Sequence, residues 1–335
     1  MEKGHVEDES KSPPLKSNQH IVMAFLTYAF PFTYIAWFVA LVLGITTGFF
    51  IFSAFAIAVF ILLYSLDMIR IMPLAEKLEK LLRYFYADTI GCVEENIKKS
   101  LTVAVPESVL GAAAGAGKPI IYIWIPHGLF ATSLYYHSIS THTDMPAALK
   151  PISPVIHHWT RYIPFSSEIF AHYNITYSTY NDMLGALKAG KSISVALGGV
   201  REMDETGETT IHTTIAKRKG IYRLAVETGA AIVPVISYGE NSLFRPATHW
   251  LAHGLNRLLR PLGLAAPIPS WESARNWLNI ANQPLPHGSH SVFGDPISAD
   301  KHSVDTLKTL VLESINTLYS ATRPPHYSES IEFVD

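Results

Sequence analysis

One long uncharged segment limits what this chain can fold into. From Ile21 to Leu66 the sequence contains no Asp, Glu, Lys or Arg. A helix that crosses a bilayer core needs about 20 apolar residues, so this segment is long enough for two spans. Gly44 and Gly48 interrupt it near its middle and predict a tight reversal. We therefore expect a hydrophobic transmembrane helical hairpin over residues 20–69; one tilted span with a re-entrant segment, or a pair of buried core helices, are the alternatives.

Basic residues on both sides of the uncharged segment indicate its orientation. Lys11 and Lys16 precede it, Arg70 and Lys77 follow it, and the reversal carries no basic residue. Because cytosolic flanks of membrane spans are enriched in Lys and Arg, both ends of the hairpin should face the cytosol. Residues 1–19 mix charged residues with Ser and Pro and are expected to form a disordered cytosolic tail.

Charge and cysteine content exclude several classes of protein. The net charge is −2, so no overall field favours a nucleic-acid partner. Cys92 is the single cysteine, which excludes an intrachain disulfide framework and a multi-cysteine metal site. His157 and His158 are adjacent, and adjacent side chains do not face one another on a helix. We expect neither a nucleic-acid partner nor a metal site.

Residues 70–117 are expected to form an amphipathic helix followed by a connection. Leu74, Leu78 and Leu81 recur at helical spacing among Lys and Glu residues, as on one face of a surface helix. The following run of Gly and Ala over residues 111–117 predicts a flexible connection.

Residues 118–335 alternate between short apolar runs and helical stretches, which predicts an α/β domain whose sheet is flanked by helices. The apolar runs, expected to be buried strands, cover residues 120–124, 193–197 and 232–236. The stretches expected to be helices cover residues 129–140, 180–189, 215–228 and 303–320, with a polar tail after the last.

Residues 243–282 interrupt this alternation. Leu251, Leu255 and Leu258 lie among arginines that include Arg257. A basic amphipathic segment of this kind lies either in a membrane interface or on the protein surface as an ordinary helix.

The strongest local signal for chemistry is Pro126-His127-Gly128, directly after an apolar run. A strand that ends where a helix begins places side chains at the mouth of a cleft, and Gly128 permits a tight turn there. The unperturbed pKa of histidine, near 6.5, suits proton transfer near neutral pH. We therefore take His127 as the candidate general base, although a structural role is the default for any one histidine.

Two further groups follow the second apolar run. Gly198 and Gly199 come directly after it, and Arg201 and Glu202 place opposite charges beside them. This pattern indicates either a ligand-approach turn or a plain turn with a surface ion pair. A basic cluster over residues 217–219 lies at the start of a predicted helix and could hold the phosphates of coenzyme A; the alternative is a solvated run of charge.

These features occur in an order that resembles the diacylglycerol acyltransferase type 2 family, which includes monoacylglycerol and wax-alcohol acyltransferases. The stretch KRKGIYRLAVETGAAIVPVISYGEN is the most specific part, and the resemblance covers roughly residues 20–335. The motifs are Pro-His-Gly at 126–128, Gly-Gly-x-x-Glu at 198–202, Arg-Lys-Gly at 218–220, Gly-Ala-x-Ile-Val-Pro-Val at 229–235, Gly-Glu-Asn at 239–241 and Gly-x-Pro-Ile at 294–297.

The resemblance implies a glycerolipid-acyltransferase-like sheet and a hairpin-anchored enzyme of the endoplasmic reticulum membrane and lipid droplets, with its catalytic domain facing the cytosol. Such an enzyme uses acyl-CoA as substrate, a neutral lipid as acceptor and no metal or cofactor; a homo-oligomer is a further expectation. His127 matches the catalytic histidine, and Glu202 the glutamate that shapes the same site. The residues expected to bind substrate are Pro126, Gly128, Gly198, Gly199, Arg201, Arg218, Lys219, Gly239, Glu240 and Asn241.

Some positions depart from the family pattern. Ile125 stands where many members have a first histidine, and Thr132 stands where distantly similar glycerolipid acyltransferases have an aspartate. Glu202 is therefore our candidate for orienting His127. Diacylglycerol is the favoured acceptor; monoacylglycerol, a wax alcohol or a sterol are alternatives, and a non-catalytic scaffold of the endoplasmic reticulum or lipid droplet is the alternative of another class.

Overall fold

The structure is a computed structural model, and it describes residues 71–335 except 116, 163–165, 205–209, 260–265, 301, 326, 328–329 and 334–335. The expected tail over residues 1–19 and the expected hairpin over residues 20–69 lie outside the described residues. Within the described part of the chain, no helix combines the length and the apolar character that crossing a membrane requires.

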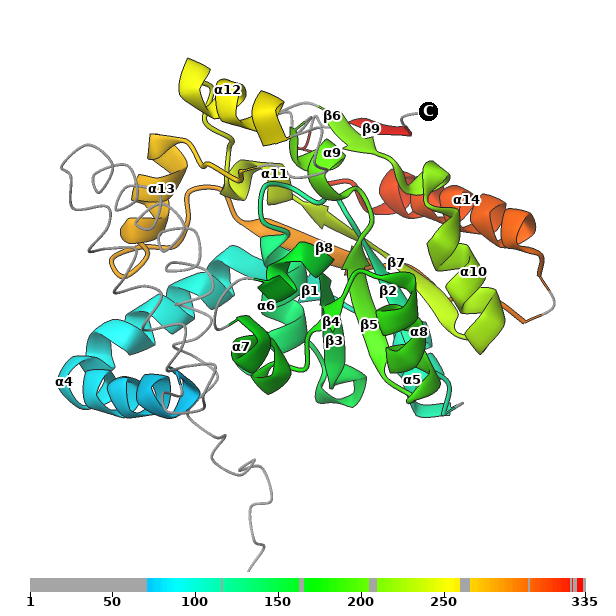
Figure 1. Ribbon diagram of the computed structural model, residues 1–335, viewed down its shortest axis with the longest axis horizontal. Coiled ribbons are helices and arrows are strands. Elements are labelled where there is room, and N and C mark those ends of the chain that lie inside the picture. The colour runs from blue at the N-terminus through cyan, green and yellow to red at the C-terminus, as the bar shows by residue number, and fades with distance from the viewer. Residues whose placement is uncertain are drawn as a thin grey trace, which may run out of the picture.

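The described residues form a seven-stranded sheet with helices on both faces (Figure 1). Its strand order is β1-β8-β7-β2-β5-β3-β4. The strands are β1 (Leu101–Ala104), β2 (Ile120–Ile125), β3 (Ile152–Ile156), β4 (Thr176–Tyr177), β5 (Ser192–Ala196), β7 (Ala231–Tyr238) and β8 (Ser289–Phe293). β6 (Thr210–Thr213) and β9 (Ser330–Phe333) pair in a separate small sheet.

Strand direction decides where a site can form. β7, β2, β5, β3 and β4 all run parallel, so their carboxyl ends meet at one edge of the sheet. β8 runs antiparallel to β7 and therefore starts at that same edge. In open α/β sheets, ligands bind outside the carboxyl ends of the strands. We call this edge the site edge.

The helices complete the two outer layers of the fold. They are α4 (Ile71–Ser100), α5 (Glu107–Gly115), α6 (Thr132–Ile139), α7 (Ser166–His172), α8 (Tyr180–Lys188), α9 (Gly199–Asp204), α10 (Lys219–Thr228), α11 (Glu240–Leu243), α12 (Trp250–Leu259), α13 (Trp271–Leu278) and α14 (Val304–Thr322). The described residues also form the short 3-10 helices η3 (Ala147–Leu149), η4 (His158–Tyr162) and η5 (Ile215–Lys217).

The central strand β2 is buried on both faces, as its unbroken apolar sequence predicts. Ile121 and Ile123 pack with apolar residues of α8, α10 and α14, and α10 and α14 lie side by side on that face (Figure 1). Tyr122 and Trp124 point the other way and pack with Val109 of α5 and residues of α6. This two-sided burial fixes β2 and therefore the loop that follows it.

The predicted strands and helices of residues 118–322 are present within a few residues of their expected bounds. One expectation was wrong. Residues 111–115 continue helix α5 rather than forming a flexible connection, because the run is rich in Ala, the strongest helix former, and Val109 of the same helix is buried. The tail after residue 322, expected to be polar, contributes the strand β9, which pairs with β6.

Candidate active site

His127 stands at the centre of the site edge, two residues after β2 ends. Its side chain is half-buried. The ring nitrogen Nδ1 lies 2.8 Å from the carbonyl oxygen of Gly128. A carbonyl oxygen only accepts hydrogen bonds, so Nδ1 carries the proton and donates it. The other ring nitrogen, Nε2, then holds a lone pair in the neutral imidazole, which is the form that a general base requires.

Glu202 joins this loop to the neighbouring strand β5, because it lies on α9 directly after that strand. Its Oε2 accepts a hydrogen bond from the backbone N–H of His127 at 3.1 Å. Its Oε1 accepts one from the backbone N–H of Thr214 at 3.0 Å. Only 4% of Glu202 is exposed. The sequence suggested that Glu202 orients the imidazole; in the structure it holds the main chain of His127, while the Gly128 carbonyl holds Nδ1 of the ring.

Gly198 makes this position of Glu202 possible. A Cβ atom on residue 198 would overlap the Cδ, Cγ and Oε2 atoms of Glu202. The carboxylate therefore occupies the space that any larger residue at position 198 would fill. Gly199 follows with φ +57, the left-handed region that favours glycine, and starts α9. Gly198 is therefore needed for the close approach of the Glu202 side chain, and Gly199 for the left-handed turn.

Glu240 fixes the loop from the opposite side, at the end of β7. Its two carboxylate oxygens accept hydrogen bonds from the backbone N–H groups of Thr132, at 2.5 Å, and Ser133, at 3.2 Å. The Ser133 hydroxyl also donates to it, at 2.5 Å. These groups form the first turn of α6, where unpaired N–H groups and the helix dipole favour a negative charge. Residue 132 itself is not an acid, but its backbone N–H is bound by the carboxyl group of Glu240, the first residue of α11 after β7.

Gly128 is pressed against Glu240. Its φ is +58, and a Cβ atom there would lie 2.9 Å from Cγ of Glu240. Gly239 and Asn241 flank Glu240. Gly239 has φ +86 and packs against Tyr327 and Gly288. Asn241 is buried, with 4% of its surface exposed. The Gly-Glu-Asn segment, expected to bind substrate, therefore packs against the catalytic loop through Glu240.

Burial shifts the pKa values of all three ionisable groups. It lowers the pKa of His127, an effect that the hydrogen bond to Gly128 partly offsets. It raises the pKa of Glu202 to about 7, against the hydrogen bonds from Thr213, Thr214 and His127. It likewise raises the pKa of Glu240 to about 7, against the hydrogen bonds from Ser133 and Thr132. The site therefore keeps His127 neutral at pH 7.

This electrostatic arrangement predicts the acid side of the pH–rate profile. Burial disfavours the imidazolium form, so neutral His127 persists at pH values where a free histidine would be protonated. The midpoint of the acid limb of kcat/KM should therefore lie below pH 6.5, measured on wild type and on the double variant Glu202→Gln/Glu240→Gln, which removes the two carboxyl groups whose pKa is about 7. An acid limb at or above pH 6.5 in both proteins would contradict this account of His127.

Basic residues lie beside the glycine turn. A terminal nitrogen of Arg218 lies 3.4 Å from the carbonyl oxygen of Gly198, and its side chain is exposed. Lys219 is also exposed and forms an ion pair with Asp305 at 3.4 Å. Arg201 belongs to α9, and Pro126 is buried directly before His127. The structure thus brings Arg218 to the mouth of the site and turns Lys219 toward α14.

Sequence reasoning missed His157 as a member of this edge. It follows β3, a short strand interrupted by Pro154, which the apolar pattern did not reveal. Burial, the neighbouring His158 and the charge of His127 lower the pKa of His157, in that order. Among the described residues, no group of three or more His, Cys, Asp or Glu side chains is placed to hold a metal ion.

Known proteins resemble this chain in sequence. The 2-acylglycerol O-acyltransferase 1 of Homo sapiens is 23% identical over 218 residues, 59% of this chain and 64% of that one. The diacylglycerol O-acyltransferase 2B of Umbelopsis ramanniana is 40% identical over 157 residues, 43% of this chain and 45% of that one. The chain thus spans less than two thirds of the length of these relatives.

Among solved structures, the 1-acyl-sn-glycerophosphate acyltransferase of Thermotoga maritima matches with a TM-score of 0.41 and 16% identity, over 73% of this chain and 87% of that one. A family model described as diacylglycerol acyltransferase matches residues 117–322, which is more than half of the chain and includes His127, Glu202 and Glu240. The chain therefore belongs to the diacylglycerol acyltransferase family.

Proposed function

We propose that this chain transfers a fatty acyl group from acyl-CoA to the hydroxyl of a neutral lipid, with diacylglycerol as acceptor and triacylglycerol as product. The observation that carries the proposal is the state of His127. Its Nδ1 proton is bound to the Gly128 carbonyl, and its Nε2 is left as the basic nitrogen at the site edge. This is the arrangement that deprotonation of a hydroxyl requires.

In the proposed reaction, Nε2 of His127 takes the proton of the acceptor hydroxyl as the hydroxyl oxygen attacks the thioester carbonyl. A C–O bond forms, and the carbonyl oxygen becomes a tetrahedral oxyanion. We assign its stabilisation to backbone N–H groups near Gly128 and Gly199, whose positive φ angles turn the main chain sharply at both loops. The C–S bond then breaks, and the coenzyme A thiolate leaves with the proton from the imidazolium.

Glu202 and Glu240 support this step without touching the reacting atoms. Each accepts hydrogen bonds from backbone N–H groups on either side of the catalytic loop, at His127 and at Thr132 with Ser133. The loop is therefore held at both ends by strands that neighbour β2. Such positioning is what converts a moderate base into an effective one.

We assign the phosphates of acyl-CoA to the exposed basic cluster around Arg218. A guanidinium forms strong charge-assisted hydrogen bonds with phosphate, and Arg218 lies beside Gly198 at the mouth of the site. Arg218→Ala should raise the KM for acyl-CoA about tenfold, since a hydrogen bond to a charged group contributes about 1.5–3 kcal/mol.

A thioester without phosphates separates this role from a structural one. Arg218→Ala should use an acyl-pantetheine thioester, which has no phosphate, as well as wild type does. The control is Lys188→Ala on α8, which removes an exposed lysine paired with Glu227. This variant should have the wild-type KM for both acyl-CoA and acyl-pantetheine. Equal losses with both donors in Arg218→Ala would contradict the phosphate assignment.

The proposal also covers the membrane anchoring and the cellular location of the enzyme. We propose that the uncharged segment over residues 20–69 anchors the chain in the endoplasmic reticulum membrane, with the catalytic domain facing the cytosol and access to lipid droplets. The basic flanks of that segment and the single cysteine, Cys92, support this orientation. The acceptor then reaches the site edge from the bilayer.

The test uses membranes that contain the full chain and matched membranes without it. Labelled acyl-CoA is offered with diacylglycerol, monoacylglycerol, a long-chain alcohol or a sterol in turn. Ester formed with diacylglycerol at the highest kcat/KM supports the proposal, whereas a preference for monoacylglycerol would replace the acceptor. If no acceptor yields ester above the matched membranes, the proposed function fails and the non-catalytic scaffold takes its place.

A further inference from the structure

Most of the exposed large apolar side chains of the described residues lie in two segments of the chain. Among the described residues they are Tyr84, Trp159, Tyr162, Val226, Trp250, Leu258, Trp271 and Leu278. All of these except Tyr84 and Val226 follow the carboxyl end of β3 or of β7. We call this set of six the interface belt: Trp159, Tyr162, Trp250, Leu258, Trp271 and Leu278.

Strand direction places the interface belt at the site edge. η4, which carries Trp159 and Tyr162, begins two residues after β3 ends. α12 and α13 lie in the connection that leaves the carboxyl end of β7 and enters the start of β8, and both points are at the site edge. Figure 1 shows α11, α12 and α13 grouped together near α9 on this side of the sheet.

α12 and α13 each present apolar side chains on both faces. On α13, Ala274 and Trp277 are buried, whereas Trp271 is 75% and Leu278 is 57% exposed. The exposed Arg275 lies between them at helical spacing. α12 repeats the arrangement with exposed Trp250, Arg257 and Leu258, and with Ala252 buried on the inner face. Each outer face therefore combines a tryptophan, an arginine and a leucine.

A chain of aromatic contacts joins α13 to the residues that follow the catalytic loop. Trp277 stacks on Phe244, with ring centroids 4.7 Å apart, and donates its indole N–H to the carbonyl of Leu243. Phe244 meets Phe130 edge to face at 4.8 Å. Phe130 is three residues after His127. The buried face of α13 thus contacts residues that pack beside the catalytic loop, and the opposite face of the same helix is exposed.

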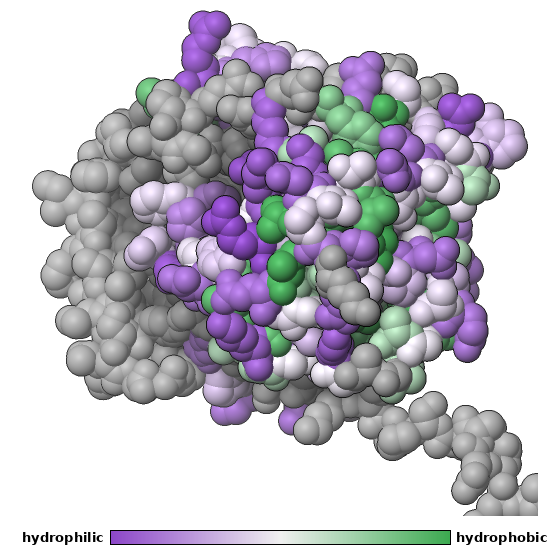
Figure 2. Space-filling view, turned by 90° about the vertical axis from the view of Figure 1, so that its right-hand side faces the viewer, coloured by the Kyte–Doolittle hydropathy of each residue, from purple (hydrophilic) through white to green (hydrophobic). Residues whose placement is uncertain are grey.

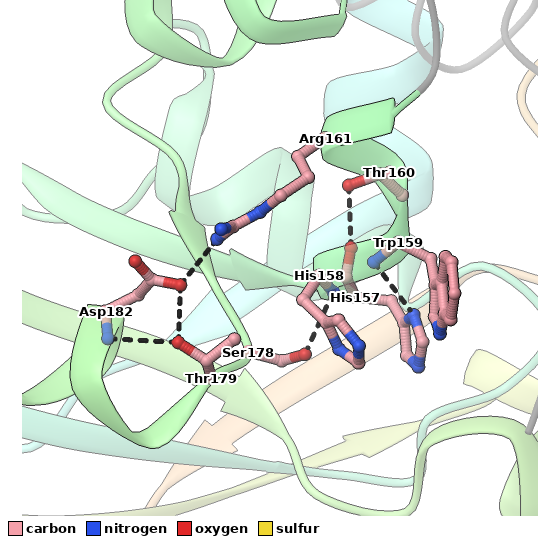
Figure 3. A network of polar contacts seen from close by, with 8 residues as sticks. All are labelled: His157, His158, Trp159, Thr160, Arg161, Ser178, Thr179 and Asp182. Carbon is pink, nitrogen blue, oxygen red and sulfur yellow. Dashed lines mark hydrogen bonds and ion pairs between the residues drawn. The ribbon is translucent and has the colours of Figure 1, made fainter.

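The other segment of the interface belt is held by a polar network (Figure 3). Arg161 binds Asp182 at 2.6 Å and lies over the ring of Tyr177. The backbone N–H of His158 donates to the Ser178 hydroxyl. The backbone N–H of Trp159 donates to Nδ1 of His157 at 3.4 Å, and the ring of Trp159 lies 5.5 Å from the ring of Tyr162 between centroids. The polar residues fix η4 to β4 and α8 while the two aromatic rings remain exposed.

We propose that the interface belt rests on the lipid–water interface of a phospholipid bilayer, which places the site edge against the lipid. Tryptophan and tyrosine concentrate at membrane interfaces, and leucine enters the acyl region. Arg257 and Arg275 on the same outer faces match the phosphate headgroups. On the side that carries α10 and α14, Figure 2 shows hydrophilic and intermediate residues interspersed with hydrophobic ones. Only one part of this inference rests on the proposed function, namely that the bilayer supplies the acceptor lipid.

The test places a dye on the full chain reconstituted in vesicles that contain anionic phospholipid. Cys92→Ser removes the single cysteine, and Trp250→Cys or Trp271→Cys then introduces one labelling position; Leu278→Cys is a further position should either fold poorly. Val226→Cys on α10 is the matched control, because Val226 is exposed outside the interface belt. We expect a blue-shifted emission and quenching by a bilayer-borne quencher at positions 250 and 271 but not at 226.

Emission at positions 250 and 271 that matches position 226, without lipid quenching, would overturn the inference. Protection that grows with the protein-to-lipid ratio and is insensitive to the lipid quencher would overturn it in favour of a second copy of the chain. The dye response needs no turnover. Ester formation without a dye response would thus reject only the inference, whereas a dye response without ester would reject only the proposed function.

Discussion

Alanine at position 127 is expected to lower the rate of acyl transfer by a factor of about 10²–10⁴, the usual contribution of a positioned general base. The substitution removes Nε2, which the Nδ1 bond to Gly128 leaves as the basic nitrogen. The backbone N–H of residue 127 remains and can still donate to Glu202. The loop should therefore keep its place, and the melting temperature of the full chain should change little. KM for acyl-CoA should also stay close to that of wild type.

A second histidine provides the control for this experiment. His158→Ala removes a half-buried imidazole whose ring stacks on His157, with centroids 4.7 Å apart, outside the catalytic loop. Its rate should stay within a few-fold of wild type. Equal rates for His127→Ala and wild type would show that another group takes the hydroxyl proton, and the proposed mechanism would then fail.

The sequence predicted those site residues that lie in glycine-containing loops directly after buried strands. Pro126-His127-Gly128 and Gly198–Glu202 each follow an apolar run, and the structure joins them through the bond between the His127 N–H and Glu202. The strands themselves were visible because β2, β5 and β7 lie in the middle of the sheet and are apolar on both faces. Hydrophobic pattern is strongest for such central strands.

The role of Glu240 could not be read from the sequence. Its partners, Thr132 and Ser133, lie more than 100 residues earlier, and only the packing of β7 beside β2 brings them together. The sequence showed that position 132 lacks an acid, but not that Glu240 of α11 would bind the backbone N–H of this residue. Pairings of this kind depend on strand order, which follows from tertiary packing rather than local pattern.

Strands β3 and β8, which lie next to the edge strands β4 and β1, escaped prediction for a related reason. β3 is short and contains Pro154, so it lacks the continuous apolar signal of the central strands, and His157 at its end was not placed in the site. β8 alternates between buried and partly exposed residues and runs antiparallel to β7. Nothing local to residues 289–293 specifies that direction. The turn of the chain through α12 and α13 determines it.

Gly198→Ala is expected to lower the rate of acyl transfer by about 10²-fold. A methyl group at position 198 would occupy the space of the Glu202 carboxyl group, so the side chain of Glu202 must turn away. The backbone N–H groups of His127 and Thr214 then lose their acceptor. Leaving a buried donor unpaired costs about 1–3 kcal/mol, and each 1.36 kcal/mol transferred to the activation barrier is a tenfold loss of rate. Steady-state rates of the full chain in membranes would measure the effect.

A double-mutant cycle with Glu202→Ala shows whether the loss passes through the carboxylate. If Gly198 serves to admit Glu202, each single variant should lose a similar amount of activity, and the double variant should be little worse than either. Gly185→Ala is the matched control, because a Cβ at that position on α8 meets no atom within 4 Å. Additive losses in the double variant would show that Gly198 acts through its own main chain. A wild-type rate in Gly198→Ala would mean that the hold of Glu202 on His127 is not needed for catalysis.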